Sequence, residues 1–285
     1  MEWKPLLLKD KQLLDQLLRD DQLSLSDYTF TNLWIWNISR KYQRALIDGF
    51  LCIKFDYEGK QTYLHPIGRG NKRPIIEKLL ASEPFLRMRA VPENALSELQ
   101  NLPLNIQEET AHFDYIYAFQ DLLHLHGDRF QPKRNFIHQF ERNYIYEYRQ
   151  ITPDLIPKIV EAEIAWFNEH PSPSGGMLFE HEGILNALKD YSALQTYGGA
   201  LIVENRVIAY SIAEYLSKEM LVVHLEKCLK EFKGGYAMIN QQMLKHLKEV
   251  PFINREEDLG LDNLTKVKAS YHPIRLEKKF LLTKV

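Results

Sequence analysis

Hydrophobic and polar positions follow two different periods along the first part of the chain. Residues 11–19 place their leucines on one helical face, which predicts an amphipathic helix. Residues 50–57 alternate large apolar side chains with smaller or polar ones, which predicts a strand that turns and returns over 61–67. A basic, glycine-containing loop at 68–74 then leads into a helix predicted at 75–81. This half therefore reads as a hairpin followed by a loop and a helix.

The rest of the chain alternates between the same two periods. Thr152 is a plausible helix N-cap with Pro153 in the first turn, and the helix predicted there runs to about Phe167. A two-residue turn at 204–205 joins two apolar runs, which indicates a hairpin. The other predicted elements are strands at 113–117, 144–149, 220–225, 251–254 and 274–282, and helices at 136–140, 182–191, 235–247 and 261–266.

The order of elements is similar in the two halves. Each half has a hairpin, then a loop with glycine and basic residues, then a helix, although residue identity between the halves is low. We therefore expect an α+β (mixed α/β) protein made of two copies of one module. The expected domains are residues 1–143 and residues 144–285, the second of which carries the main motifs.

Composition places the chain among ordinary globular proteins. Of its 285 residues, 45% are hydrophobic and 26% are charged, and the net charge of -2 argues against non-specific nucleic-acid binding. Cys52 and Cys228 lie far apart in apolar runs, so we expect two buried free thiols. No secretory leader and no integral membrane segment is recognisable, which favours the cytoplasm. The sequence does not indicate an oligomeric state.

The loop that precedes the helix at 235–247 has the pattern of an anion site. It carries Lys230, Lys233, Gly234 and Gly235 after a strand. The free N–H groups and the dipole of a helix start can hold a phosphate or the oxygen of a polarised carbonyl. An ordinary α/β turn with solvated lysines explains the same residues equally well.

The preceding strand carries polar side chains. Strict alternation puts His224 and Glu226 on one face and Lys227 on the other. Polar groups on a central strand are unfavourable to bury without a partner, which favours a catalytic or positioning pair. The alternative is a satisfied polar pair at the edge of the sheet.

A dense group of polar residues follows the strand predicted at 251–254. Asn254, Arg255, Glu256, Glu257 and Asp258 come where that strand ends, and ligand groups gather at such strand ends in α/β sheets. The acids suit a substrate ammonium or proton abstraction from an attacking amine. An acidic helix start explains the acids equally. An acidic helix start does not explain Asn254, Arg255 or the nearby Lys266 and Lys268.

A second basic cluster precedes the helix predicted at 136–140. Lys133, Arg134 and Asn135 suit phosphate contacts, for example to an RNA backbone, and a solvated helix turn is the alternative. His124 and His126 place two imidazoles close together, but no third ligand has suitable spacing, so no metal site is predicted.

These motifs together resemble one bacterial family. The resemblance rests on His224–Lys227, Gly235-Tyr236 with Asn240, the run from Asn254 to Gly260, the run from Lys266 through Ser270 and Tyr271 to Pro273, and Lys133-Arg134-Asn135. The chain is similar to the C-terminal, cytosolic domain of phosphatidylglycerol lysyltransferases, over nearly its whole length. The membrane-embedded half of those relatives has no counterpart in this sequence, and Thr265 stands where relatives often carry Arg.

The resemblance implies two tandem domains of the GNAT (N-acetyltransferase-like) fold. It implies a transferase that moves an aminoacyl group from aminoacyl-tRNA to an amine or hydroxyl acceptor, either a small molecule or a lipid headgroup. One alternative is an N-acyltransferase with acyl-CoA as donor. Another is a non-catalytic tandem module that binds a ligand.

The first hypothesis gives each motif a role. Asp258 or Glu226 would activate the acceptor, with His224 beside them, and backbone N–H groups of residues 224–227 would stabilise the oxyanion. Residues that would contact the substrates or the tRNA acceptor end are Lys227, Lys233, Gly234, Gly235, Tyr236, Asn240, Asn254, Arg255, Glu256, Lys266, Lys268, Ser270, Tyr271, Lys133, Arg134 and Asn135.

Overall fold

The computed structural model describes residues 2–21 and 23–285, and its elements gather into two compact units. Unit 1 comprises Met1–Tyr115, Glu256–Thr265 and Leu276–Val285. Unit 2 comprises Ile116–Arg255 and Lys266–Arg275. Each sheet has seven strands and mixes parallel with antiparallel pairs. The predicted boundary at residue 143 lies inside unit 2, and the assignment of contiguous halves to the two domains stays a prediction.

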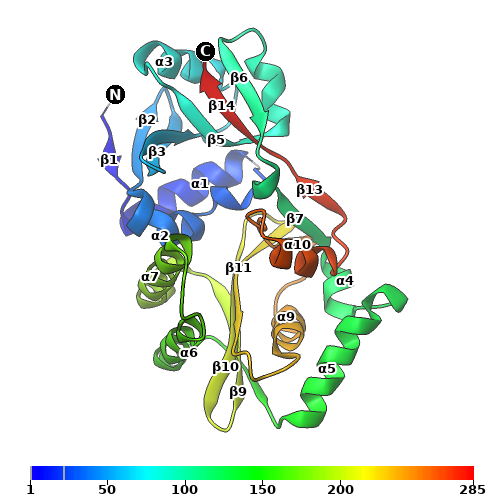
Figure 1. Ribbon diagram of the computed structural model, residues 1–285. Helices are drawn as coiled ribbons and strands as arrows, with labels where there is room; N and C mark the ends of the chain where they lie inside the picture. Colours follow the sequence, from blue (N-terminus) through cyan, green and yellow to red (C-terminus); the bar gives the residue numbers. More distant parts are fainter. Residues whose placement is uncertain (1, 22) are drawn as a thin grey trace. The chain divides into compact units, whose positions relative to one another are not determined.

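Unit 1 is a sheet with helices packed against it (Figure 1). Its strands, in the order β1-β2-β3-β4-β5-β14-β6, are Lys4–Pro5, Gln43–Ile47, Phe50–Tyr57, Lys60–Leu64, Arg87–Pro92, Lys279–Lys284 and Leu104–Glu108. Its helices are α1 (Lys11–Asp21), α2 (Phe30–Arg40) and α3 (Arg73–Ser82). The apolar side of α3 packs with β2, β3, β4, β5 and β14 into one core, as the spacing of Ile75, Ile76, Leu79 and Leu80 requires.

Local sequence sets the ends of α2. The Thr29 side chain caps its start by accepting a hydrogen bond from the Asn32 backbone N–H at 3.1 Å. Lys41 ends it in the left-handed conformation at φ 48°. As a result Arg40, the last helical residue, lies at the turn into β2.

Unit 2 places its sheet between helices. The strands, in the order β13-β7-β12-β11-β10-β9-β8, are Arg275–Glu277, Asp114–Ala118, Phe252–Asn254, Met220–Cys228, Arg206–Tyr215, Tyr197–Val203 and Glu147–Gln150. Figure 1 shows α6 (Ile156–Asn168) and α7 (Gly175–Lys189) on one face and α9 (Gly235–Lys245) on the other. The remaining helices are α4 (Phe119–His124), α5 (Gln131–Asn143), α8 (Tyr191–Leu194) and α10 (Asp262–Ala269).

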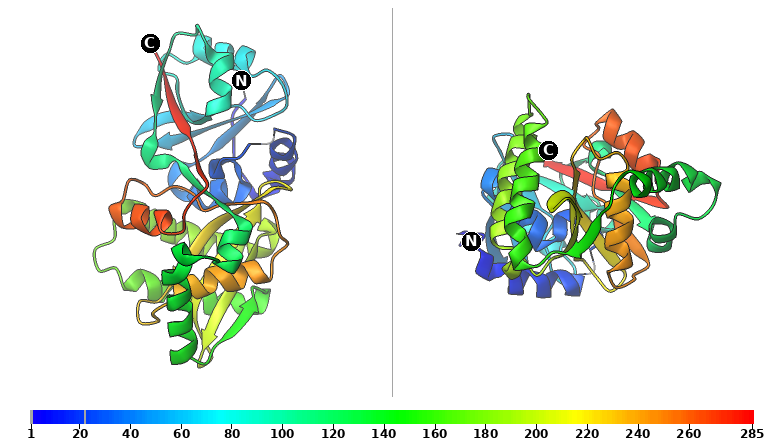
Figure 2. Two further views of the ribbon diagram at one scale, coloured as in Figure 1. Left: turned by 90° about the vertical axis from the view of Figure 1, so that its right-hand side faces the viewer. Right: turned by 90° about the horizontal axis from the view of Figure 1, so that it is seen from below.

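The two sheets share one pairing pattern. Four strands pair antiparallel, the fourth pairs parallel with a fifth, and the fifth pairs antiparallel with a sixth. In each sheet the sixth strand comes from the other half of the sequence. β14 completes the sheet of unit 1 from the C-terminal end of the chain, whereas β7, from the N-terminal half, completes the sheet of unit 2. Figure 2 shows the red strand β14, which ends at the C label, among the blue and cyan segments of the N-terminal part of the chain, because it belongs to the sheet of β1 to β6.

Several predicted elements have different limits in the structure. α5 begins at Gln131 rather than at residue 136, so Lys133, Arg134 and Asn135 lie inside the helix and not before it. α7 begins at Gly175 rather than at residue 182, because the Ser174 side chain caps it by accepting from the Met177 N–H at 3.2 Å. The strand predicted over 274–282 is two strands, β13 and β14, which belong to different sheets. A continuous apolar run shows that a segment is extended, but it does not show which sheet each part joins.

Candidate functional site

The predicted site residues divide between the two units. Asp258 and Glu256 belong to unit 1. The other candidates belong to unit 2, from Lys133 in α5 to Tyr271 after α10. Each group is therefore described within its own unit.

An ion pair between Glu226 and Arg255 forms the centre of the unit 2 group. Arg255 Nε donates to Glu226 Oε2 at 3.0 Å, and Arg255 Nη2 donates to the same oxygen. Asn240 Nδ2, from α9, donates to Glu226 Oε1 at 2.9 Å. Both charged side chains are 11% exposed. The carboxylate thus accepts from N–H donors on both of its oxygens.

The strand pattern brings these two residues together. The parallel pairing of β11 with β12 ends at Val222 and Asn254. β12 ends there, while β11 continues to Cys228, so Arg255 leaves the sheet beside a stretch of β11 that has no β12 partner. Glu226 lies on that stretch. On this side β11 therefore has no β12 partner beyond Val222, which is the arrangement that an oxyanion site requires.

Aromatic rings surround the Arg255 guanidinium. Its Cζ lies 4.6 Å from the ring centroid of Tyr271 and 5.7 Å from that of Tyr117. Burial opposes the charged guanidinium, but Glu226 outweighs it and raises the pKa of Arg255 above its usual range. Arg255 is therefore a fixed positive charge.

Lys133 lies on the same tyrosine. Its Nζ is 3.9 Å from the Tyr271 ring centroid and donates to Ser270 Oγ at 2.6 Å. Burial, with the positive charge of Arg255, lowers the pKa of Lys133 to about 8. An amine with this pKa is neutral in a useful fraction of molecules near neutral pH, so it can accept a proton.

The end of α10 is tied to this group by backbone contacts. Lys268 Nζ donates to the Arg255 carbonyl oxygen at 2.5 Å. Tyr117 Oη donates to the Lys268 carbonyl oxygen at 2.8 Å. These contacts fix the backbone on either side of the ion pair, so Lys268 acts here as a positioning residue.

His224 and Lys227 have partners elsewhere in unit 2. The register of β11 on β10 skips His224 between Val223 and Leu225, a β-bulge that interrupts the strict alternation expected from sequence. His224 Nε2 lies 3.4 Å from Glu214 Oε2. Lys227 Nζ pairs with Glu180 of α7 at 2.8 Å and lies 3.7 Å from the Trp166 ring, on the sheet face away from α9.

The start of α9 is closely packed. A Cβ on Gly234 would lie 2.2 Å from the Phe136 carbonyl oxygen, and one on Gly235 would lie 2.4 Å from Cys228 Sγ. Glu169 already accepts from the Lys230 N–H at 3.1 Å. The glycines are thus explained by packing. Lys233 is exposed, and Tyr236 Oη accepts from Trp166 Nε1 at 3.0 Å.

The other members of the basic cluster on α5 have local contacts. Arg134 Nη1 donates to the Gly127 carbonyl oxygen at 2.8 Å and so holds the loop before the helix. Asn135 Oδ1 accepts from Gln131 Nε2 at 2.8 Å. Of the three predicted residues, Lys133 alone contacts Ser270 and Tyr271 within the described part of the chain.

Asp258 organises a loop of unit 1. Its Oδ2 accepts from Tyr115 Oη at 2.7 Å and from Thr265 Oγ1 at 2.5 Å, and its Oδ1 accepts from the Gly260 N–H at 2.9 Å. Asn32 Nδ2 contacts Glu256 Oε1 at 3.4 Å. Thr265, which stands where relatives often carry Arg, is thus a partner of Asp258 in this chain.

Sequence reasoning missed Tyr117 and a charged group in unit 1 around Lys279. A lysine among alternating apolar residues near the end of the chain was the available signal, since a lysine rarely enters a core without carboxylate partners. Among residues 2–21 and 23–285, no cluster of three or more metal-ligating side chains occurs. None of the helices described is both long and apolar enough to cross a membrane.

Comparison with known proteins agrees with this architecture. An uncharacterized protein of Mycoplasmoides gallisepticum is 25% identical over 177 residues, which cover 59% of this chain, and the chain spans 55% of that relative's length. A conserved protein of unknown function from Bacteroides thetaiotaomicron, solved by crystallography, is 31% identical with a TM-score of 0.94 over 100% of both chains. The structure of L-PGS from Bacillus licheniformis is 12% identical, with a TM-score of 0.70 over 96% of this chain and 92% of that one.

The predicted fold is confirmed by these likenesses, which show two tandem GNAT-like domains with mixed sheets. The family model described as phosphatidylglycerol lysyltransferase, C-terminal, matches residues 21–283. The chain therefore belongs to the family of the phosphatidylglycerol lysyltransferase C-terminal domain.

Proposed function

We propose that this chain is an aminoacyltransferase that moves an aminoacyl group from aminoacyl-tRNA to an amine or hydroxyl acceptor. The observation that carries the proposal is the Lys133 amine, which lies on Tyr271 beside Ser270 with its pKa lowered to about 8. Membership of the family supports the reaction class. The fixed positive charge of Arg255 supports binding of an anionic donor.

In this mechanism Lys133 is the general base. The acceptor gives its N–H or O–H proton to neutral Lys133 Nζ as its nitrogen or oxygen bonds to the ester carbonyl carbon. The open backbone edge of β11 stabilises the oxyanion. The bond from that carbon to the tRNA ribose oxygen then breaks, and protonated Lys133 returns a proton to this oxygen.

The sequence hypothesis gave the basic role to Asp258 or Glu226. Both carboxylates already accept hydrogen bonds from several protein donors, so their oxygens are occupied by contacts within the protein. We therefore propose Glu226 as the residue that positions Arg255. Lys233 and Lys266 would add positive charge for the donor phosphates.

The test is a transfer assay with Lys133→Arg, which keeps the charge but cannot give up a proton near neutral pH. The purified protein receives tRNA charged with isotope-labelled amino acids, together with phosphatidylglycerol vesicles or a pool of small amines and alcohols. Mass spectrometry then identifies the labelled products. We expect Lys133→Arg to lower turnover by about 10²–10⁴-fold. Lys245→Arg, an exposed lysine on α9, is the matched control.

Each outcome of the assay separates the hypotheses. Turnover by Lys133→Arg equal to the unmodified chain would remove Lys133 as base while leaving the reaction in place. If the protein consumes acyl-CoA but no aminoacyl-tRNA, the donor is acyl-CoA and the alternative hypothesis of an N-acyltransferase replaces the first. Binding without turnover of either donor would favour a non-catalytic module.

A further inference from the structure

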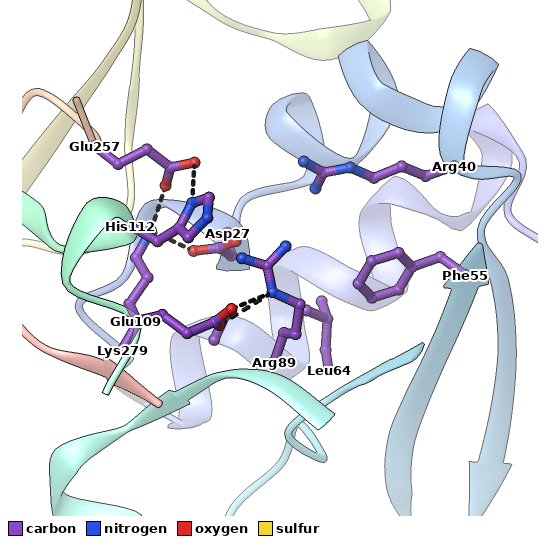
Figure 3. A pocket seen from close by; sticks show the side chains of 10 residues that line it. Asp27, Arg40, Phe55, Leu64, Arg89, Glu109, His112, Glu257 and Lys279 are labelled. Carbon is purple, nitrogen blue, oxygen red and sulfur yellow. Dashed lines mark hydrogen bonds and ion pairs between the residues drawn. The ribbon is translucent and has the colours of Figure 1, made fainter. Parts of the chain in front are cut away.

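A charged pocket lies within unit 1, and its lining belongs to that unit alone. Its charged and titratable side chains include Arg40, Arg89, Asp27, Glu257, His112 and Lys279. Figure 3 shows the Arg40 guanidinium on one side of this pocket and Glu257 with His112 on the other. Nothing in the transfer mechanism proposed above uses these residues.

Arg40 supplies a positive charge that no carboxylate neutralises directly. Its Nη1 donates to Tyr42 Oη at 3.0 Å, and its Cζ lies 4.7 Å from the Trp36 ring and 5.5 Å from the Tyr57 ring. Throughout the described residues, no carboxylate comes within ion-pair distance of Arg40. The planar fork of an arginine suits a carboxylate with two parallel hydrogen bonds. This end of the pocket is therefore built to accept an anion.

The opposite end has an excess of negative charge. One ammonium, Lys279 Nζ, is shared by Asp27 at 2.6 Å, Asp114 at 2.7 Å and Glu257 at 2.8 Å. Burial would raise the pKa of Glu257, but Lys279 and His112 outweigh it and hold that pKa well below its usual range. At this end three carboxylates share one ammonium, so acidic side chains outnumber the lysine, which favours a second cation.

The middle of the pocket is neutral. Arg89 Nε donates to both carboxylate oxygens of Glu109, at 2.8 Å and 3.0 Å. Its guanidinium also lies 3.9 Å from the Tyr57 ring. This pair is already satisfied, so it separates the cationic end from the acidic end without adding net charge.

The backbone beside Arg89 is held in a strained form. Ala90 lines the pocket with φ 51°, a left-handed conformation that costs a residue other than glycine about 1–2 kcal/mol. The bulge is fixed from two sides. Two β5 residues lie opposite one β14 residue, and Tyr28 Oη donates to the Ala90 carbonyl oxygen at 2.8 Å. Strain of this kind gathers at ligand sites.

We propose that this pocket binds a small zwitterion of the amino-acid class, with its carboxylate on Arg40 and its ammonium on Asp27 and Glu257. The carboxylate of such a ligand accepts hydrogen bonds from the Arg40 guanidinium. Its ammonium adds a second cation to the carboxylates around Lys279. This ligand differs from the aminoacyl ester of a charged tRNA, because the ester has no free carboxylate. None of the residues that line the pocket takes part in the proposed transfer mechanism, so this proposal stands whether or not transfer occurs.

Isothermal titration and thermal shift with matched ligands test this binding. The probes are glycine, L-alanine, L-serine, L-lysine and L-glutamate, with propionate and L-alaninamide as analogues of alanine that lack the ammonium or the carboxylate. We expect at least one amino acid to bind saturably, and its analogues lacking either charged group to bind at least about tenfold more weakly. Propionate or alaninamide binding as well as alanine would refute the zwitterion.

The matched variants are Arg40→Gln and Arg69→Gln, the second being an exposed arginine of the same unit. We expect Arg40→Gln to weaken the binding amino acid at least about tenfold, and Arg69→Gln to leave its affinity within about twofold. Circular dichroism confirms that both variants are folded. Equal affinity in Arg40→Gln, or no saturable binding of any probe to the unmodified chain at concentrations up to about 10 mM, would overturn the proposal.

Discussion

Unit 1 and unit 2 have sheets with the same strand pairing, but the ratio of acidic to basic side chains at their charged centres is opposite. In unit 1 a single lysine, Lys279, serves three carboxylates. In unit 2 a single carboxylate, Glu226, serves Arg255 and Asn240, and the second cation, Lys133, lies on Tyr271. The common fold therefore does not decide the chemistry. The side chains near the parallel strand pair decide it.

The two centres also differ in what burial does to them. Lys279 is 1% exposed and is surrounded by partners, so its charge is structural. Lys133 has a hydroxyl and an aromatic ring rather than a carboxylate as neighbours, and its pKa falls to about 8. The charge of Lys279 therefore stabilises the fold, whereas the amine of Lys133 is available for proton transfer.

The largest expected effect is the loss of the unit 1 centre in Lys279→Met. The buried Asp114 and the partly buried Asp27 and Glu257 would lose their shared cation, so we expect the free energy of unfolding to fall by about 3–5 kcal/mol. Urea unfolding and hydrogen exchange in β5 and β14 measure it. The exposed neighbour Lys278→Met should stay within about 0.5 kcal/mol. Equal losses in both variants would contradict a structural charge.

Acidification should weaken unit 1 through His65. This imidazole is 2% exposed, and neither ring nitrogen has a hydrogen-bond partner in the described part of the chain. Burial lowers the pKa of His65 from 6.5 to about 3. The unfolded chain therefore takes up the proton first as the pH falls. The resulting loss in the free energy of unfolding is about 2 kcal/mol between pH 7 and pH 5.

His65→Leu tests this loss directly. Urea midpoints at several pH values should show a smaller loss in His65→Leu than in the unmodified chain. The exposed His138→Gln should keep the full loss. An unchanged pH dependence in His65→Leu would assign the acid sensitivity to other groups.

A smaller effect is expected in unit 2 from Arg255→Lys. Lysine keeps the charge, but it loses the two-pronged contact with Glu226 and the stacking on Tyr271. We expect the free energy of unfolding to fall by about 1–2 kcal/mol, measured by urea unfolding. Arg206→Lys, in a surface pair with Glu231, is the control and should change by less than about 0.5 kcal/mol. If the control loses as much stability as Arg255→Lys, the two hydrogen bonds from the Arg255 guanidinium to Glu226 do not account for the effect.

The smallest expected effect has the opposite sign. Ala90→Gly removes the clash of a Cβ at φ 51°, which outweighs the extra freedom of glycine in the unfolded chain, so stability should rise by about 0.5 kcal/mol. Ala45→Gly, a buried alanine of β2, should instead lower stability by about 1 kcal/mol. Thermal unfolding of the pair measures both. A loss in Ala90→Gly would show that the bulge is not strained.

Local patterns predicted most of the strands and helices because their signals are local. The strand at Phe50–Tyr57 and the turn between β9 and β10 follow from alternation and from turn residues. β1, β2, β5 and β6 were not predicted. β5 shows why, since its bulge at Ala90 is fixed by Tyr28, from a segment far away in sequence. Pairing between distant segments has no local signature.

The site was foreseen in its residue types more than in its contacts. Glu226, Asn240, Arg255, Lys133, Ser270 and Tyr271 do come together in unit 2. His224 has another partner, because a bulge at this residue interrupts the alternation and sequence does not reveal it. Lys227 lies on the face opposite Glu226, as alternation predicted, and pairs there with Glu180. Tyr117 and Arg40 carried no local signal, because their importance comes from the neighbours that folding brings to them.

The exchanged sixth strand sets an order of events during synthesis. β14 lies between β5 and β6 of unit 1, but the ribosome makes it after every strand of unit 2. Until residues 279–284 emerge, β5 and β6 each have an open edge, and open edges recruit other chains. The strands of unit 2 are all made by residue 277. The synthesis of unit 1 therefore begins first, but its sheet is completed last. A chaperone would be needed for nascent unit 1.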